Sequence, residues 1–372
     1  MKKRRIVIAS VLKPVDDTRA FEKMAQTLVN QNFEVFLIGQ PSQNATSTNP
    51  SIHFLQLAKI HRISFARWFT PLVVGRKIYQ VKPELLIVNT HELLIVAIVY
   101  RILFGAKILY DIQENYAQNI LSTEAFPRVI RLPLAAWVKL KERCASHWFH
   151  HFLLAEKSYE NELGFIGKKY SVVENKVALP RGFRRLPTPS KRKLIFTGTL
   201  AENTGVFQAI ELAKKLHAID TITELELLGF CAQRSTLQRI QSAIQGCTFI
   251  TLKGGENLVP HREIFEAIST ANFGIISYPI RPYLQHKMPT KLFEYLACQL
   301  PILLQNNIEW TTLLNQFGGG IVLDFNNYDP IRLLSQIRSS SFYAISKSES
   351  LHRLDWASEE DALLRVVRLY CS

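Results

Sequence analysis

The chain has 372 residues, 47% of them hydrophobic and 20% charged, which excludes a disordered chain and allows two domains that each bury a core. Its net charge is +14, with 27 Lys/Arg against 14 Asp/Glu in residues 1–185 and 18 against 17 in residues 186–372. The basic excess therefore lies in the first half. Five scattered cysteines argue against a disulfide framework or a zinc site and indicate a reducing compartment.

The first half alternates between apolar stretches of strand length and amphipathic stretches of helix length. The predicted strands are Ile6–Ser10, Glu34–Ile38, Ile52–Leu57, Leu85–Val88, Lys107–Asp111 and Phe152–Leu154. The predicted helices are Arg19–Gln31, Phe65–Gln80, His91–Phe104 and Arg128–His150. This alternation predicts a parallel, doubly wound sheet.

The segment Pro180–Arg192 contains three prolines and five basic residues, which predicts a linker. Beyond it the alternation resumes. The predicted strands there are Lys193–Phe196, Leu225–Gly229, Thr248–Leu252, Phe273–Tyr278 and Pro301–Leu304. The predicted helices are Gly205–His217, Ser235–Ile244, His261–Ser269, Thr290–Cys298 and finally Trp356–Tyr370. We therefore expect an α/β chain of two facing Rossmann-like domains, with an interdomain cleft at the carboxyl ends of both sheets.

The N-terminus and the most apolar segment bear on the cellular location of the protein. Met1-Lys-Lys-Arg-Arg5 leads directly into a predicted strand, so no secretory signal peptide is expected. The segment Leu85–Phe104 is interrupted by polar residues, and its longest apolar run, Leu93–Tyr100, is too short to span a bilayer. These features predict a cytoplasmic protein.

The stretch Lys287–Ile302 has the pattern of an anion site. Pro289 suits the first position of a helix that follows a buried strand, and the hydroxyl of Thr290 lies at the same helix start. The N–H groups and the dipole at such a start attract anions, and Lys287 and Lys291 add positive charge. Glu294 follows one turn later on the same face. A phosphate clamp with a carboxylate one turn away suits a sugar nucleotide, whose ribose hydroxyls would meet the carboxylate.

Several motifs resemble those of GT-B fold glycosyltransferases, in particular glycosyltransferase family 4. In the first half these are Asp17-Thr-Arg19, Val88-Asn-Thr-His-Glu92 and Tyr110-Asp-Ile-Gln-Glu-Asn-Tyr116. In the second half they are Phe196-Thr-Gly-Thr-Leu200 and, most specifically, Pro289-Thr-Lys-Leu-Phe-Glu-Tyr-Leu-Ala297. The resemblance implies an acceptor domain of residues 1–180, joined by the C-terminal helix 355–372, and a donor domain of residues 181–354.

The same resemblance implies roles for individual residues. The donor-binding residues would be Gly198, Thr199, Lys287, Thr290, Lys291 and Glu294, with Glu294 on the ribose and the others near the diphosphate. Asp17 and Arg19 would touch the acceptor or pair with each other. The catalytic candidates are His91, Asp111, Gln113 and Glu114. No metal ligand and no cofactor are implied, because the helix dipole and basic side chains would stabilise the leaving diphosphate.

Four positions depart from the family pattern. His286 stands where a first glutamate is usual, Thr199 and Thr204 stand where the family often has Arg or Lys, and Gln113 replaces a histidine near the reacting sugar. Glutamine hydrogen-bonds but does not act as an acid or base. The cation that meets the diphosphate is then to be sought among Lys253, Arg281, Lys287 and Lys291, and the sequence leaves this choice open.

Two stretches, Lys59–Lys77 and Arg128–Lys141, mix Lys and Arg with Trp, Phe, Ile and Leu. This composition is typical of helices at an anionic bilayer surface. It predicts a peripheral membrane protein at the inner face of the cytoplasmic membrane. No nucleic-acid-binding motif is present, so we expect no nucleic acid partner.

The predicted function is a metal-independent glycosyltransferase that passes a sugar from a nucleoside diphosphate sugar to a lipid-linked or cell-envelope saccharide, with retention. Three alternatives stay open. One is a sugar-nucleotide epimerase, another is a phosphorylase on the same scaffold, and the third is a catalytically inactive, glycosyltransferase-like binding subunit.

Overall fold

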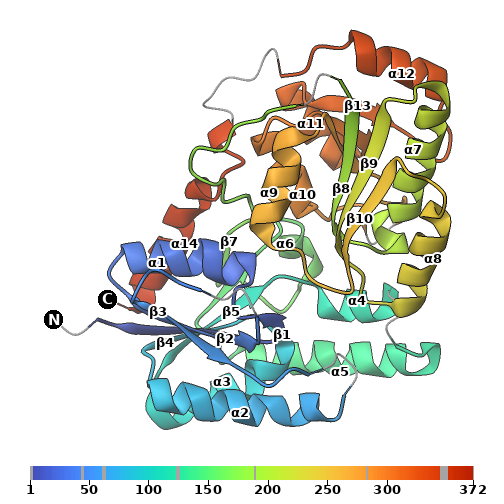
Figure 1. Ribbon diagram of the computed structural model, residues 1–372. Helices are drawn as coiled ribbons and strands as arrows, with labels where there is room; N and C mark the ends of the chain where they lie inside the picture. The colour runs from blue at the N-terminus through green and yellow to red at the C-terminus, as the bar shows by residue number, and fades with distance from the viewer. Residues whose placement is uncertain are drawn as a thin grey trace. The chain divides into compact units, whose positions relative to one another are not determined.

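The computed structural model divides the chain into two compact units. Unit 1 comprises Met1–Asn175 and Glu359–Ser372, and unit 2 comprises Lys176–Ser358 (Figure 1). The residues that the structure describes are 3–42, 46–60, 64–122, 126–187, 190–281, 284–343 and 351–371. Thr188 and Pro189 of the predicted linker, and residues 61–63 of the first basic stretch, lie outside the described residues.

Unit 1 is built on a seven-stranded sheet in the order β3-β2-β1-β4-β5-β6-β7, in which all neighbours are parallel. The strands are β1 Arg5–Pro14, β2 Glu34–Gln40, β3 Ile52–Gln56, β4 Leu85–Val88, β5 Lys107–Ile112, β6 His151–Leu154 and β7 Tyr170–Val172. The chain reverses its direction of winding between β1 and β4. Such a switch point is where ligands bind in open α/β sheets, at the carboxyl ends of the strands.

Helices cover both faces of this sheet (Figure 1). One face carries α2 Ala66–Val81, α3 Leu94–Phe104 and α5 Arg128–Ser146, whose inward stripes join the main core through side chains such as Val74, Ala97 and Ala145. The other face carries η1 Thr18–Ala25, α1 Gln26–Asn30 and α14 Ala357–Tyr370. Short elements complete the unit: η2 His91–Leu93, α4 Tyr116–Ser122 and α6 Tyr159–Glu162. Among the described residues, none of the helices is long and apolar enough to cross a membrane.

The predicted helix Arg19–Gln31 begins as a π-helix. Thr18–Ala25 has π-helical hydrogen bonding, and the side chain of Asp17 caps it by accepting from the Ala20 N–H at 3.2 Å. A π-helix is wider than an α-helix and is rare outside functional sites. Here it brings two long cations, Arg19 and Lys23, onto the buried side.

Unit 2 is a second parallel sheet, of six strands in the order β10-β9-β8-β11-β12-β13. The strands are β8 Arg192–Thr199, β9 Thr223–Phe230, β10 Ile250–Gly255, β11 Phe273–Ile276, β12 Ile302–Gln305 and β13 Gly320–Leu323. Its helices are η3 Glu202–Thr204, α7 Val206–Ile219, α8 Arg234–Ile244, α9 His261–Thr270, α10 Thr290–Ala297, α11 Ile308–Phe317 and α12 Pro330–Ser339. The switch point of this sheet lies between β8 and β11.

Three elements of unit 2 occupy a segment to which the sequence analysis assigned no structure. In α11, the side chain of Asn307 caps the start and Gly318 ends the helix with φ +57°. In α12, Asp329 caps the start and Pro330 takes the first helical position. These are ordinary start and stop signals, so both helices were predictable. The short strand β13 follows a run of glycines and gives a weak pattern.

Candidate functional site

Glycines shape the loop at the end of β8, beside the switch point of unit 2. Gly198 has φ +94°, a conformation that other residues rarely adopt. A Cβ at Gly229 would lie 1.6 Å from the carbonyl oxygen of Gly198, so the ends of β8 and β9 meet too closely for a side chain. At Gly198 itself a Cβ would lie 3.9 Å from the Cε of Lys291, with no other atom of the described residues, apart from its chain neighbours, within 4 Å. The backbone at Gly198 is therefore open to a ligand beside Lys291.

Lys291 is the most unusual charge in unit 2. Its side chain is 7% exposed, and its Nζ has no hydrogen-bond partner among the described residues. The ammonium lies 3.9 Å from the centre of the Phe196 ring and 5.2 Å from that of Tyr278, so aromatic faces are its main contacts. Burial lowers the pKa of Lys291 to about 7, although the carboxylate of Glu294 opposes this shift. A buried ammonium without a hydrogen-bonded partner is costly unless an anion arrives.

Glu294 lies one turn after Lys291 on α10 and is 9% exposed. Its Oε1 is 3.2 Å from Nε2 of His261, the first residue of α9. The His261 ring packs on Phe265 with 4.7 Å between ring centres. Sequence reasoning missed His261, and its place directly after Pro260 at the start of a predicted helix was the available signal.

Pro289 is the N-cap residue of α10, one position before the first helical position that its sequence pattern suggested, and its side chain makes no capping hydrogen bond. Thr290 follows as the first helical residue and is half-buried. Lys287 is half-buried two residues before the cap, and its carbonyl accepts a hydrogen bond of 2.7 Å from the Trp310 indole N–H. Trp310 thus fixes the turn that leads into the helix. The Leu292 N–H donates to the carbonyl of Pro289 at 2.9 Å, so an anion at this helix start would meet the N–H groups of Thr290 and Lys291.

Three of the residues that depart from the family pattern make defined contacts. Thr204 donates a hydrogen bond of 2.7 Å to the carbonyl of Thr199, so the two threonines close the loop after β8. His286 lies 2.7 Å from Glu309 of α11. Lys253, within β10, forms an exposed ion pair of 2.7 Å with Glu263. Among the cations that the sequence left open, Lys291 is the one that is both buried and beside the open backbone of Gly198.

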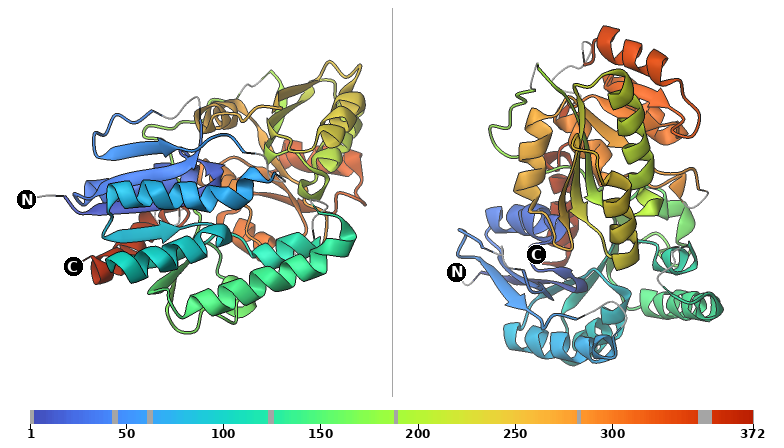
Figure 2. Two further views of the ribbon diagram at one scale, coloured as in Figure 1. Left: turned by 90° about the horizontal axis from the view of Figure 1, so that it is seen from below. Right: turned by 45° about the vertical axis from the view of Figure 1, so that its right-hand side comes forward.

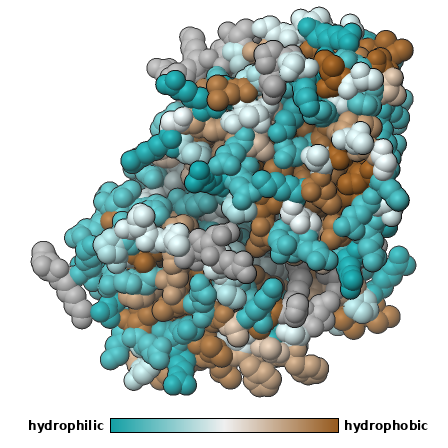
Figure 3. Space-filling view, in the orientation of Figure 1, coloured by the Kyte–Doolittle hydropathy of each residue, from teal (hydrophilic) through white to brown (hydrophobic). Residues whose placement is uncertain are grey.

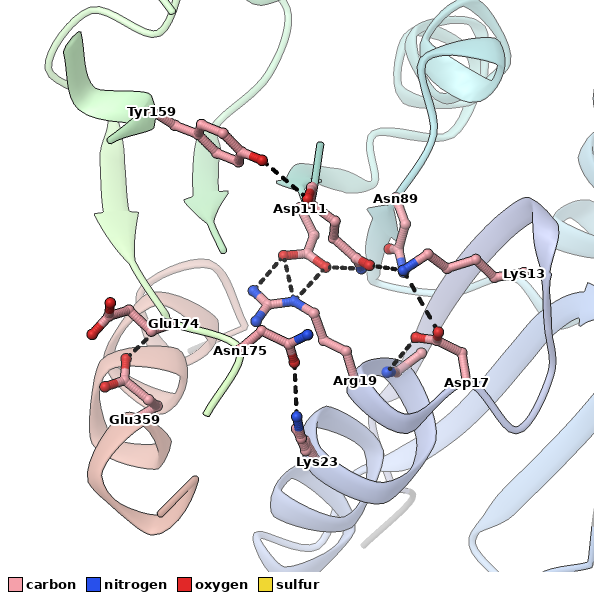
Figure 4. Close-up of polar contacts among 12 residues, drawn as sticks. Lys13, Asp17, Arg19, Lys23, Asn89, Asp111, Tyr159, Glu174, Asn175 and Glu359 are labelled. Carbon is pink, nitrogen blue, oxygen red and sulfur yellow. Dashed lines mark hydrogen bonds and ion pairs between the residues drawn. The ribbon is translucent and has the colours of Figure 1, made fainter. Parts of the chain in front are cut away.

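In unit 1, polar side chains from three segments form a connected chain at the carboxyl edge of the sheet (Figure 4). The guanidinium of Arg19 holds Asp111 in a bidentate contact, with Nη2–Oδ1 at 2.7 Å and Nε–Oδ2 at 3.1 Å. Gln113 donates to Asp111 at 2.5 Å and accepts from Lys13, which lies 3.5 Å from Asp17. Arg19 is 1% exposed and Asp111 is 0% exposed. The structure therefore buries both as an ion pair, and Arg19 pairs with Asp111 instead of Asp17.

Asn89 lies beside this chain, directly after β4. It is 0% exposed, and neither polar atom of its side chain has a hydrogen-bond partner among the described residues. It lines a small cavity with Ser10, Lys13 and Asp17. The main-chain carbonyl of Asn89 accepts a hydrogen bond of 2.7 Å from the Tyr116 hydroxyl. An unsatisfied buried amide is rare, so a bound water or a ligand hydroxyl is the expected partner.

His91 and Glu92 follow on η2 and are held by the flanking helices. Nδ1 of His91 is 2.7 Å from the ammonium of Lys141 on α5, and Glu92 accepts from Nε of Arg67 on α2 at 2.9 Å. Burial lowers the pKa of His91 to about 4, so the ring is neutral near pH 7. With Nδ1 accepting from an ammonium, the ring proton lies on Nε2. Burial raises the pKa of Glu92, but His91 and Arg67 outweigh it and the net pKa is lowered.

The four catalytic candidates thus lie at the ends of two neighbouring strands, β4 and β5. Glu114 accepts a hydrogen bond of 2.8 Å from Asn119, within the start of α4. The residues that orient the candidates were missed by sequence reasoning: Lys13, Arg67 and Lys141. Each comes from a distant segment and carried no local signal. In the described part of the chain, no group of three or more His, Cys, Asp and Glu side chains has the arrangement of a metal site.

Comparison with solved structures gives the same architecture over whole chains. Sucrose-phosphate synthase from Thermosynechococcus elongatus superposes with a TM-score of 0.75 at 12% identity, covering 99% of both chains. HepE of Anabaena, in complex with UDP and glucose, gives 0.68 at 11% identity over 98% of this chain and 99% of that one. The trehalose 6-phosphate synthase of Burkholderia multivorans gives 0.64 at 14% identity over 100% of both.

No protein-family model and no curated protein matches the chain. At 11–14% identity, the structural likeness shows the fold. That fold is the GT-B fold of glycosyltransferases. The predictions of an α/β chain with two Rossmann-like domains, and of a resemblance to this fold group, are confirmed.

Proposed function

We propose that the chain is a glycosyltransferase that uses a nucleoside diphosphate sugar as donor. The observation that carries the proposal is Lys291, a buried ammonium beside the open backbone of Gly198 and the first turn of α10. The named neighbours of the same fold support this reading, since they include a sucrose-phosphate synthase and a HepE complex with UDP and glucose.

The arrangement around α10 favours a nucleoside diphosphate over a simple anion. The diphosphate would meet the ammonium of Lys291 and the first N–H groups of the helix, which together supply positive charge without a metal. The carboxylate of Glu294, one turn deeper, is an acceptor-only group that suits the two hydroxyls of a ribose. His261 fixes the orientation of that carboxylate from the neighbouring helix.

The same groups suit the departure of the diphosphate. In the proposed transfer, the bond from the anomeric carbon to the diphosphate oxygen breaks, and its electron pair leaves with the phosphate. The acceptor hydroxyl bonds to the same face of that carbon, and its proton passes to the leaving phosphate oxygen. Lys291 and the helix start would stabilise the developing negative charge, and the configuration would be retained.

The acceptor is proposed to bind at the carboxyl edge of unit 1. His91 offers a neutral Nε2–H there, and Asn89 offers an amide without a protein partner among the described residues. Gln113 and Asp17 complete the set of polar groups. Arg19 and Asp111 would act by holding this edge rigid. We propose a lipid-linked or cell-envelope saccharide as acceptor, reached at the inner face of the cytoplasmic membrane.

The test is a transfer assay on the pure protein with a panel of nucleotide sugars and saccharide acceptors. The expected result is release of the nucleoside diphosphate that depends on the acceptor, with the anomeric configuration retained in the product by NMR. Lys291→Met should lower turnover roughly 10- to 100-fold, the range of one charge-assisted hydrogen bond. Lys191→Met, at an exposed lysine of the same unit that pairs with Glu224, is the matched control and should leave turnover unchanged.

The same assay separates the alternatives. An epimerase converts the donor without any acceptor, and a phosphorylase requires inorganic phosphate. A binding subunit binds the nucleotide but turns over no donor with any acceptor in the panel. Each of these outcomes would contradict the transferase proposal.

A further inference from the structure

The outward stripes of α2, α3 and α5 in unit 1 are apolar. On α2 the exposed side chains include Trp68, Phe69 and Leu72, which are 76%, 64% and 69% exposed. On α3 and α5 they include Leu103, Leu132 and Trp137. Among the described residues, 15 of the 26 exposed large hydrophobic side chains lie on these three helices. Single exposed apolar residues are common, but a run of this kind marks an interaction surface.

The three helices form one continuous surface, which we call the docking face. In the view from below in Figure 2 they run alongside one another, and α3 contacts both of its neighbours. The rings of Tyr79 on α2 and Phe104 on α3 lie 5.5 Å apart, and Arg101 of α3 donates to the carbonyl of Trp148 just after α5. In Figure 3, hydrophobic and hydrophilic side chains mix along the lower edge of the view, where α2 lies.

The charge of the docking face is of one sign. The three helices carry nine Lys/Arg and a single Asp/Glu. That acid, Glu142, is 5% exposed and accepts a hydrogen bond of 2.8 Å from the Tyr110 hydroxyl. All the charges on the solvent side are therefore positive, among them Arg76, Lys139 and Arg143. Aromatic and aliphatic side chains interspersed with cations fit the headgroup region of an anionic bilayer.

We propose that this face docks unit 1 onto an anionic lipid bilayer. The docking helices also hold the candidate acceptor edge, because Arg67 of α2 contacts Glu92 and Lys141 of α5 contacts His91. An acceptor anchored in that bilayer would then reach His91 without leaving the membrane. This last step rests on the proposed transferase function, whereas docking itself does not.

The test is sedimentation of the full chain with vesicles of phosphatidylcholine alone and with vesicles that also contain phosphatidylglycerol. We expect binding to the anionic vesicles that weakens between about 0.1 M and about 1 M salt, as the Debye length falls from roughly 10 to roughly 3 Å. The double variant Arg76→Gln with Lys139→Gln should weaken binding roughly 30-fold, from about 1 kcal/mol per lost cation. The double variant Trp68→Ser with Leu132→Ser should weaken vesicle binding at low and at high salt, because it removes apolar contacts. The control Ile331→Ser, at an equally exposed apolar site on α12, should leave vesicle binding unchanged.

Nucleotide binding, measured on the same preparations, keeps this test separate from the proposed function. Variants that lose vesicles but still bind nucleotide support the docking face. If the wild-type protein does not bind anionic vesicles, the docking proposal is overturned, whether or not the protein binds nucleotide. The proposal is also overturned if light scattering shows a dimer that the double variant Trp68→Ser with Leu132→Ser dissociates. A second copy of the chain would then cover the docking face.

Discussion

At the scale of single residues, two buried cations meet different partners. Arg19 is held by a bidentate carboxylate, Asp111, within unit 1. Lys291 has aromatic rings around it in unit 2, and its Nζ has no hydrogen bond to the described residues. A paired buried charge indicates a structural role, whereas a buried charge without a hydrogen-bonded partner, at a helix start beside open backbone, indicates a binding role.

Lys291→Met should stabilise the free protein by roughly 1–3 kcal/mol, because an ammonium no longer has to be buried. The pKa of Lys291 is about 7 when folded and 10.5 in its unperturbed state. Between these values the unfolded state binds more protons, so the penalty is complete below pH 7 and fades as the pH rises toward 10.5. Urea unfolding at pH 6 and pH 9 should therefore show a larger gain at pH 6. An equal gain at both values would contradict the assignment.

Glu294→Gln should separate ribose binding from phosphate binding. If Glu294 accepts from ribose hydroxyls, the variant should bind UDP or another nucleoside diphosphate roughly tenfold more weakly, the value of a lost charged hydrogen bond. Its affinity for inorganic pyrophosphate should stay unchanged, whereas Lys291→Met should weaken both ligands. Isothermal titration with the two ligands makes the comparison. Equal losses for UDP and pyrophosphate would contradict a contact between Glu294 and the ribose.

His91→Gln should make the protein less sensitive to acid. Burial lowers the pKa of folded His91 to about 4, while the unfolded residue titrates near 6.5. Below pH 6.5 the unfolded state therefore gains protons first, and stability is lost as the pH falls toward 4. The variant should escape up to about 3 kcal/mol of this loss, by the conversion of a pKa shift to free energy. Urea unfolding at pH 7 and 4.5 tests this, with His286→Gln, at an exposed histidine, expected to match the wild type.

At the scale of elements, the π-helix η1 brings Arg19 to the end of β5. Asp111→Asn would leave the guanidinium of Arg19 without a counter-charge and should lower the free energy of unfolding by about 3–5 kcal/mol. Removing both charges, with Arg19→Met and Asp111→Leu, should recover most of that stability. Asp361→Asn, at an exposed site on α14, is the control and should change stability by less than about 0.5 kcal/mol. A stable Asp111→Asn variant without transferase activity would instead favour direct contact with the acceptor.

Sequence patterns predicted the elements whose residues are uniformly buried. Strands such as β4 and β11 are buried along their whole length, so their apolar runs were visible. The three-residue strand β7 is only half-buried and resembles a loop. The contacts within the sites were not predictable, because His91 and Lys141 are 50 residues apart and His261 and Glu294 are 33 apart. Local periodicity carries no information on which distant side chain meets which.

At the scale of the whole molecule, each unit carries polar groups at the carboxyl end of its own switch point. In unit 1 the strands β1 and β4 diverge there, and in unit 2 the strands β8 and β11 do so. Sequence motifs marked both places, since Asp17, Asn89, Gly198 and Lys291 all follow predicted strands. What the structure adds is the difference between them. In unit 1 the buried charges Arg19 and Asp111 are paired with each other, whereas in unit 2 the buried cation Lys291 has no hydrogen-bonded partner among the described residues.

The central claim, a nucleoside diphosphate site at Lys291, is tested most directly by isothermal titration. The pure protein would be titrated with UDP, GDP, ADP and CDP, alongside Lys291→Met and the control Lys191→Met. We predict saturable binding of at least one nucleotide by the wild type and by Lys191→Met, and binding weaker by roughly tenfold or more in Lys291→Met. A folded wild-type protein that binds none of the four, or a Lys291→Met variant that binds equally well, would contradict the account.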